Sequence, residues 1–333
     1  MKALFNQVVQ TNMAPPEEAA KSAEKFFTCL NTLSRPDHFN WAQEIFEDLY
    51  VARHPEKTAL VWSDIARVQI REFSYQVLME KANQLINCLR SAGVERAERV
   101  YLMAPVLPEQ WISTLAMIKA GFVNIPTATT MTHRELTFRF ETYPPEAVIA
   151  DPASAQVIDG VLEELGIEPK IKVVIGEKEK WTPFETVYQE EKEAMPALTE
   201  PDDLLFCFFT SGTTGLPKRV GHTAFSYPVG HLSTSLMLGI GPDDIHNTLS
   251  EPGWAKFLWA GFFAPFNVGA TATGFSFTFL DGEQYLDAVS RHKVSSMCAH
   301  PRAWRMFVKM NLDSFDLSGL KESVAIGGPL NPE

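Results

Sequence analysis

The sequence predicts an α/β fold in which helices flank two mostly parallel sheets. Short apolar segments recur along the chain and alternate with segments of helical periodicity. The apolar segments, such as LLFCFF at residues 204–209, are hydrophobic on both faces, as strands of a buried parallel sheet are. The chain has 333 residues, of which 45% are hydrophobic, so it can form a large core in two or three domains.

Capping and stop residues place the elements of the first half. Ser74 precedes a helix with leucines at helical spacing, and Gly93 ends that helix. Pro108 begins the next helix, which Gly121 ends. The other helices predicted in this half cover residues 17–30, 133–142, 153–165 and 183–193, and the strands cover 100–103, 122–125, 147–150 and 171–175.

The second half repeats this alternation. The strand at 204–209 precedes a polar loop and a helix near 223–237, and another helix follows Trp254. The remaining strands are predicted at 245–249, 271–275, 294–298 and 322–326, and the remaining helices at 281–291 and 301–310. We therefore expect an N-terminal extension at 1–38, a first α/β subdomain at 39–200 and a second at 201–333.

Charge and cysteine usage exclude some classes of partner. The formal net charge of -12 argues against a nucleic-acid backbone or an anionic membrane. The four cysteines form no CxxC pair and lie in apolar or helical surroundings, so we expect buried free thiols and a cytoplasmic location. The sequence shows neither a secretory signal nor a transmembrane segment.

A polar loop with the sequence TSGTTGLPK follows the central apolar strand at residues 210–218. It offers backbone N–H groups, hydroxyls and the Lys218 ammonium, and such a set of donors can surround a polyphosphate. Gly212 and Gly215 permit positive φ, and ligands of α/β proteins commonly bind beyond the carboxyl end of a strand. It is not a Walker A loop, because its glycines are three residues apart and Pro217 precedes the lysine.

Two other kinds of site find no support in the sequence. A serine-hydrolase elbow at Ser211 would need glycine where Phe209 stands. The eight histidines lack the spacing of metal ligands, so no metal site built from protein side chains is predicted.

The loop matches in full the phosphate-loop motif of the adenylate-forming superfamily, which includes acyl-CoA synthetases, luciferases and peptide-synthetase adenylation domains. Other stretches resemble its medium-chain acyl-CoA synthetase branch. They are RVYLMAPVLPEQWISTLAMIKAGFVNIP at 99–126, the Gly-Trp-Ala-Lys run at 253–256, CAHPRAWRM at 298–306 and GGPLNPE at 327–333. The likeness covers residues 39–333 and corresponds to the N-terminal portion of such enzymes.

The resemblance implies roles for individual residues. The ATP phosphates would be bound by Thr210, Ser211, Gly212, Thr213, Thr214, Gly215 and Lys218. The adenine would be held by Gly327, Gly328 and Pro329, although this branch usually has Glu where Gly328 stands. The acyl substrate would contact His222, Gly253, Trp254 and His300, and the catalytic residues would be Lys218 and His222. By residue type alone, His222 and Trp254 fit structural roles better, and only the resemblance assigns them to the site.

The implied activity is that of an AMP-forming acyl-CoA ligase. It would convert ATP, CoA and a medium-chain, branched or aromatic acid into acyl-CoA, AMP and pyrophosphate through an acyl-adenylate, with Mg²⁺. The family's later motifs and its C-terminal lid domain do not occur within these residues, so we expect the chain alone to be inactive or severely impaired and to self-associate. Two alternatives stay open, a non-catalytic nucleotide- or acyl-binding protein acting through partners, and adenylation with a carrier-protein thiol as acceptor.

Overall fold

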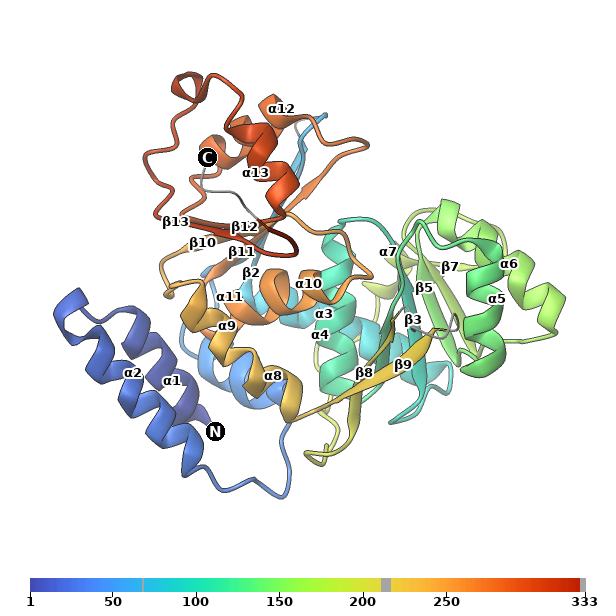
Figure 1. The fold of residues 1–333 in the computed structure, drawn as a ribbon. Helices are drawn as coiled ribbons and strands as arrows, with labels where there is room; N and C mark the ends of the chain where they lie inside the picture. The colour runs from blue at the N-terminus through green and yellow to red at the C-terminus, as the bar shows by residue number, and fades with distance from the viewer. Residues whose placement is uncertain (68, 211–216, 330–333) are drawn as a thin grey trace.

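The computed structural model describes residues 1–67, 69–210 and 217–329, which form two sheets flanked by helices (Figure 1). The predicted α/β fold is thereby confirmed. The seven-stranded sheet has the order β7-β6-β5-β3-β4-β8-β9, and its neighbouring strands are parallel except for the antiparallel pair β8 and β9. Its strands are β3 (Arg99–Met103), β4 (Val123–Pro126), β5 (Ala147–Ala150), β6 (Ile171–Val174), β7 (Thr182–Pro183), β8 (Leu204–Thr210) and β9 (Lys218–Thr223).

The six-stranded sheet has the order β13-β12-β10-β11-β1-β2. Its strands are also parallel, apart from the antiparallel pair β1 and β2 at one edge. They are β1 (Thr58–Asp64), β2 (Gln69–Ser74), β10 (Ile245–Thr248), β11 (Thr271–Ser276), β12 (Ser296–Ala299) and β13 (Glu322–Ala325). The carboxyl ends of its parallel strands therefore meet along one edge, which is where ligands of such sheets commonly bind.

The helices form layers on both sheets. Helices α3 (Tyr75–Ser91) and α4 (Pro108–Ala120) lie between the sheets, whereas α5 (His133–Thr142) and α6 (Pro152–Leu165) cover the opposite face of the seven-stranded sheet (Figure 1). Helices α12 (Gly282–Arg291) and α13 (Pro301–Phe307) cover the outer face of the six-stranded sheet. The shorter or peripheral helices are α1 (Lys2–Asn12), α2 (Pro16–Asn31), the π-helix η1 (Ala42–Val51), α7 (Phe184–Val187), α8 (Ser226–Gly230), α9 (Leu232–Met237), α10 (Ala255–Leu258), the π-helix η2 (Trp259–Phe263), α11 (Ala264–Asn267) and the 3₁₀-helix η3 (Leu312–Ser314).

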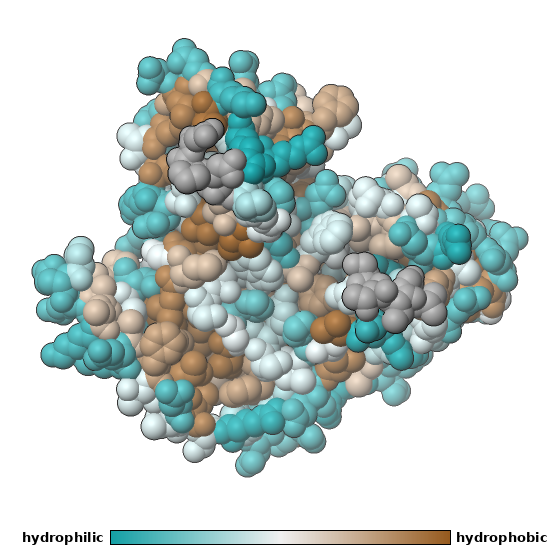
Figure 2. All heavy atoms as spheres, viewed as in Figure 1, coloured by the Kyte–Doolittle hydropathy of each residue, from teal (hydrophilic) through white to brown (hydrophobic). Residues whose placement is uncertain are grey.

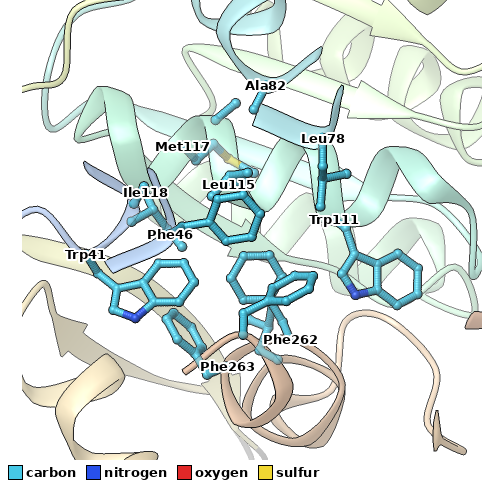
Figure 3. Close-up of a cluster of buried hydrophobic side chains, with 14 of the residues drawn as sticks. Trp41, Phe46, Leu78, Ala82, Trp111, Leu115, Met117, Ile118, Phe262 and Phe263 are labelled. Atoms are coloured by element: carbon cyan, nitrogen blue, oxygen red, sulfur yellow. The ribbon is translucent and has the colours of Figure 1, made fainter. Parts of the chain in front are cut away.

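An aromatic core joins the two sheets. Every residue of α4 is buried, and Figure 3 shows Trp111 and Leu115 of this helix among side chains from α3, η1 and η2. The ring centroids of Trp41 and Phe263 lie 5.0 Å apart with 65° between the ring planes, and the Trp41 indole donates a hydrogen bond to Asn267 Oδ1. Buried aromatic pairs of this kind hold elements distant in sequence in one arrangement.

The predicted helix boundaries at Ser74 and Gly121 are confirmed. The Ser74 hydroxyl accepts a hydrogen bond from the backbone N–H of Val77 at the start of α3. Gly121 ends α4 with φ of 69°, a left-handed conformation that glycine adopts without strain.

The helix predicted at residues 183–193 is wrong beyond Val187. After α7 the chain makes a turn and then continues without regular secondary structure beside α3, whose amide side chains donate to its carbonyls. Gln84 Nε2 donates to the carbonyls of Tyr188 and Glu190, at 2.6 and 2.9 Å, and Asn83 Nδ2 donates to that of Lys192, at 2.8 Å. These bonds use carbonyls that a helix would need for itself.

The predicted helix near residues 223–237 is also partly wrong. Its first residue belongs to β9, a strand that the sequence did not predict and that pairs with β8. The helical part that follows is broken into α8 and α9 at His231. Helix α1 was likewise not predicted, whereas the helix expected at 17–30 is confirmed as α2.

Each sheet combines strands from both sides of residue 200, the boundary expected between the two subdomains. Strands β1 and β2 come from the first stretch but belong to the sheet formed by β10 to β13. Strands β8 and β9 come from the second stretch but complete the seven-stranded sheet. Thr210 and Lys218, the two ends of the loop at 210–218, therefore belong to the seven-stranded sheet.

Candidate functional site

The two ends of the predicted phosphate loop lie side by side. Thr210 at the end of β8 pairs with Lys218 at the start of β9, and the Thr210 hydroxyl lies 3.5 Å from the Lys218 carbonyl. The Lys218 side chain is exposed. The other predicted phosphate ligands, Ser211, Gly212, Thr213, Thr214 and Gly215, lie outside the described residues.

Two arginines lie near the ends of the phosphate loop, Arg219 on β9 and Arg139 on α5. The Arg219 guanidinium lies 4.9 Å from the ring centroid of Tyr143, and that of Arg139 lies 4.6 Å from the ring centroid of Phe209. No described carboxylate forms an ion pair with either arginine. In a protein with a net charge of -12, this is a local concentration of positive charge, which suits an anionic ligand.

His222 lies in an aromatic cluster on β9. Its ring is 5.6 Å from that of Phe208 and 4.7 Å from that of Tyr227. Burial lowers the pKa of His222, and it lowers the pKa of the neighbouring His231 to about 4. Both imidazoles are therefore neutral at pH 7, the state in which a histidine can accept a hydrogen bond.

The structure brings His300 together with the predicted adenine turn at residues 327–329. His300 Nε2 lies 2.9 Å from the Gly327 carbonyl oxygen, and its Nδ1 accepts a hydrogen bond from the Arg302 backbone N–H at the start of α13. Gly327 has φ of 103°, and a Cβ atom there would lie 2.9 Å from the His300 ring. Arg305 donates to the Pro329 carbonyl, at 2.7 Å. His300 thus holds the turn against α13, and only glycine fits at position 327.

A cavity of about 650 Å³ opens at the carboxyl edge of the six-stranded sheet. His300 is the only one of the predicted substrate residues that lines it within the described part of the chain. Its apolar lining includes Val106, Trp111, Phe257, Phe275, Leu280 and Met306, and its polar lining includes Thr248, Ser250, Glu251, Thr273, Tyr285 and Arg302. The sequence did not single out these residues, although Thr248, Ser250, Glu251, Thr273 and Phe275 lie at or just after predicted strand ends, where a ligand is expected.

Gly253 and Trp254 are not among the residues that line this cavity. Gly253 has φ of 91°, and a Cβ atom there would lie 2.3 Å from the backbone nitrogen of Ala128, so this loop packs tightly against the segment after β4. The Trp254 side chain is 62% exposed. Lys256, in the same run, has a buried ammonium without a hydrogen-bond partner among the described residues, and burial lowers its pKa. The substrate role of Gly253 and Trp254 stays a prediction.

Figure 2 shows hydrophobic side chains exposed between the part of the molecule that carries the C-terminus and the body below it.

Within the described ranges, no group of three or more His, Cys, Asp or Glu side chains could hold a metal ion. No helix in the same ranges is long and apolar enough to cross a membrane.

Comparison with known proteins identifies the class of protein that this fold and site represent. A family model described as AMP-binding enzyme matches residues 48–333. The chain therefore belongs to the AMP-binding enzyme family, which confirms the resemblance seen in its phosphate loop.

The curated relatives are acyl-CoA ligases. The chain is 40% identical over 330 residues to 4-hydroxybutyrate--CoA ligase 1 of Metallosphaera sedula, an alignment that covers 99% of this chain and 57% of the relative. It is 27% identical over 306 residues to the mitochondrial acyl-coenzyme A synthetase ACSM3 of Mus musculus, covering 90% of this chain and 53% of the relative. The chain thus spans about half the length of the curated relatives that it matches.

Solved structures share the fold. The acyl-CoA synthetase of Brucella canis superposes with a TM-score of 0.78 at 21% identity, over 90% of this chain and 55% of that one. At this identity the likeness supports the fold alone.

Proposed function

We propose that this chain forms the nucleotide- and acid-binding part of an AMP-forming acyl-CoA ligase. The observation that carries the proposal is the complete phosphate-loop sequence between β8 and β9 in a chain that the AMP-binding family model matches over residues 48–333. In the first step, a carboxylate oxygen attacks the α-phosphorus of ATP, the bond to the β-phosphate breaks, and pyrophosphate leaves. In the second step, the CoA thiolate attacks the acyl carbon and AMP leaves.

The chain's own residues would bind and orient ATP. Thr210 and the Lys218 ammonium would contact the phosphates, and Mg²⁺ would arrive with them, because charge stabilisation is the main catalytic contribution in phosphate chemistry. Arg139 and Arg219 would strengthen the local positive potential. The turn at 327–329, held by His300, would receive the adenine, so that the nucleotide spans the two sheets.

His222 would act beside the reacting groups without carrying charge. Its lowered pKa supports a neutral imidazole whose N–H donates a hydrogen bond to the carboxylate and then to the adenylate. A cationic histidine at this position would instead stabilise the carboxylate ground state and reduce its nucleophilicity.

The cavity at the strand ends would receive the acyl chain. Its apolar lining supports an acid with a medium-chain, branched or aromatic skeleton, as the sequence predicted. A relative that is 40% identical is named for 4-hydroxybutyrate, so we include short hydroxylated acids in this class. We place the reaction in the cytoplasm, a proposal that the four free cysteines support. The expectation that all four are buried is wrong, because Cys29 is exposed and Cys88 is only partly buried.

ATP binding by the purified chain tests this proposal. We expect Lys218→Ala to weaken ATP affinity by at least about tenfold, a loss that matches one charge-assisted hydrogen bond. Lys309→Ala, at an exposed lysine beyond α13, is the matched control and should bind ATP like the parent protein. Isothermal titration calorimetry measures all three proteins, and an unchanged affinity in Lys218→Ala would contradict the proposal.

A further inference from the structure

The cavity at the strand ends contains hydroxyl groups deep among apolar side chains. Thr248, Thr273 and Tyr285 line it and are only 8%, 2% and 1% exposed. The charged residues of its lining, Glu251 and Arg302, are exposed. Charge therefore lies at the mouth of the cavity, and neutral hydroxyls lie inside it.

The inner hydroxyls of Tyr285 and Thr273 already donate to protein acceptors. The Tyr285 hydroxyl donates to Asn247 Oδ1, at 2.6 Å, and Asn247 Nδ2 donates to Thr273 Oγ1, at 2.9 Å. Thr273 Oγ1 in turn donates to the His246 carbonyl, at 3.1 Å. This chain of bonds fixes the floor of the cavity and leaves neither hydroxyl a hydrogen to offer a ligand.

Thr248 differs, because it keeps an unused hydrogen-bonding function. Its one partner among the described residues is His246 Nε2, at 2.9 Å, while His246 Nδ1 faces Ser296 Oγ at 3.0 Å. His246 is fully buried, and burial lowers its pKa to about 4, so one ring nitrogen carries hydrogen at pH 7. If Nε2 donates, the Thr248 hydrogen is free; if Nε2 accepts, a Thr248 lone pair is free.

The space beside Thr248 is bounded. Gly274 lines the same cavity, and the Trp111 ring lies so close that a Cβ atom at Gly274 would be 2.4 Å from Trp111 Cη2. The Trp111 indole is held in place by a hydrogen bond to the Gly261 carbonyl, at 2.9 Å. Trp111 and Gly274 therefore form a fixed wall of the cavity that Thr248 also lines.

We propose that Thr248 selects carboxylic acids that carry a hydroxyl group at the end remote from the carboxylate. An alcohol both donates and accepts, so it complements Thr248 in either state of His246, whereas a methyl group leaves the buried Thr248 function unpaired. The carboxylate faces the mouth, where His300 holds the turn at 327–329. This inference rests on the proposed ligase function and names the substrate class of the same site.

A pair of isosteric acids tests the inference. 4-Hydroxybutyrate and pentanoate differ only in a hydroxyl that replaces a methyl group. Their dissociation constants are measured by NMR titration of this chain with α,β-methylene-ATP present, which prevents turnover. We expect the chain to prefer 4-hydroxybutyrate by about tenfold, the usual effect of one neutral hydrogen bond. Thr248→Val should abolish this preference by weakening 4-hydroxybutyrate binding and not pentanoate binding.

Three further variants make the result specific. Thr248→Ser keeps the hydroxyl and should keep the preference, and Thr248→Cys replaces it by a weak hydrogen-bonding group if the valine variant does not fold. Thr271→Val, on the neighbouring strand β11 and bonded to the Thr58 carbonyl, is the matched control and should keep the preference. Equal affinity for both acids, or an unchanged ratio in the folded Thr248 variants, overturns this inference alone. Binding of neither acid overturns the proposed function as well.

Discussion

Burial decides the chemistry of the histidines in this protein. The sequence singled out His222 but could not show that its ring packs against Tyr227, which His231 also contacts. His231 also stacks on Trp259, with 6.3 Å between the ring centroids and 19° between the planes. Such surroundings penalise the charged imidazole, so these side chains stay neutral under conditions in which exposed histidines become protonated.

The pH dependence of stability follows from this burial. The unfolded chain binds a proton at His231 near pH 6.5, whereas the folded chain does so only near pH 4. Between these values the unfolded state holds more protons, so stability falls as pH falls. We expect His231 to cost about 2 kcal/mol of unfolding free energy between pH 7 and pH 5.

Urea denaturation at pH 7, 6 and 5 measures this effect. His231→Phe keeps an aromatic ring in the stack and should lose about 2 kcal/mol less than the parent protein over this range. Thr234→Val removes the hydroxyl 3.0 Å from His231 Nδ1 but keeps the imidazole, so its pH dependence should match that of the parent. Equal slopes in His231→Phe and the parent would show that His231 does not contribute.

Helices with capping residues are the elements that the sequence predicts best. The cap at Ser74 and the glycine at the end of α4 act within one turn, so their effect does not depend on the rest of the fold. The failed prediction at 183–193 shows the reverse case. There the segment satisfies its carbonyls with Asn83 and Gln84 of α3, partners that its own sequence does not reveal.

The Ser74 cap makes a measurable contribution to stability. Ser74→Ala removes the acceptor for the Val77 N–H, at 3.2 Å, and should lower the free energy of unfolding by about 1 kcal/mol. Ser91→Ala, at the other end of α3, is the matched control, because its exposed hydroxyl makes no hydrogen bond to a described residue. Chemical denaturation at neutral pH compares the two variants, and equal stabilities would contradict the role of the cap.

The whole molecule depends on contacts between the two sheets. Trp111 belongs to α4, the helix that connects β3 and β4 of the seven-stranded sheet. Its ring nevertheless lies against Gly274 in the six-stranded sheet. The same contact forms one wall of the cavity. The space for a ligand is therefore set by how the sheets pack, and no single segment encodes it.

Filling the gap at Gly274 should strain this contact. Gly274→Ala places a methyl carbon 2.4 Å from Trp111 Cη2, so ring or strand has to move, and overpacking of this kind costs about 1–3 kcal/mol. Gly261→Ala is the matched control, because its methyl group would meet Thr248 Cβ at an ordinary 3.5 Å. Trp111→Phe lacks the clashing atom, so the cost of Gly274→Ala should shrink in that background. An equal cost in both backgrounds, measured by urea denaturation, would place the strain elsewhere.

Features carried by neighbouring residues were predictable from the sequence. They include the alternation of strands and helices, the caps at Ser74 and Gly121, and the family-specific loop at 210–218, because propensity, capping and motif chemistry act over a few residues. Tertiary structure alone decided which strands share a sheet, that His300 holds the turn at 327–329, and that Thr248 lies in a cavity beside Trp111. These arrangements depend on pairing and packing between segments far apart in the chain. The free energies of those contacts cannot be inferred from any local sequence pattern.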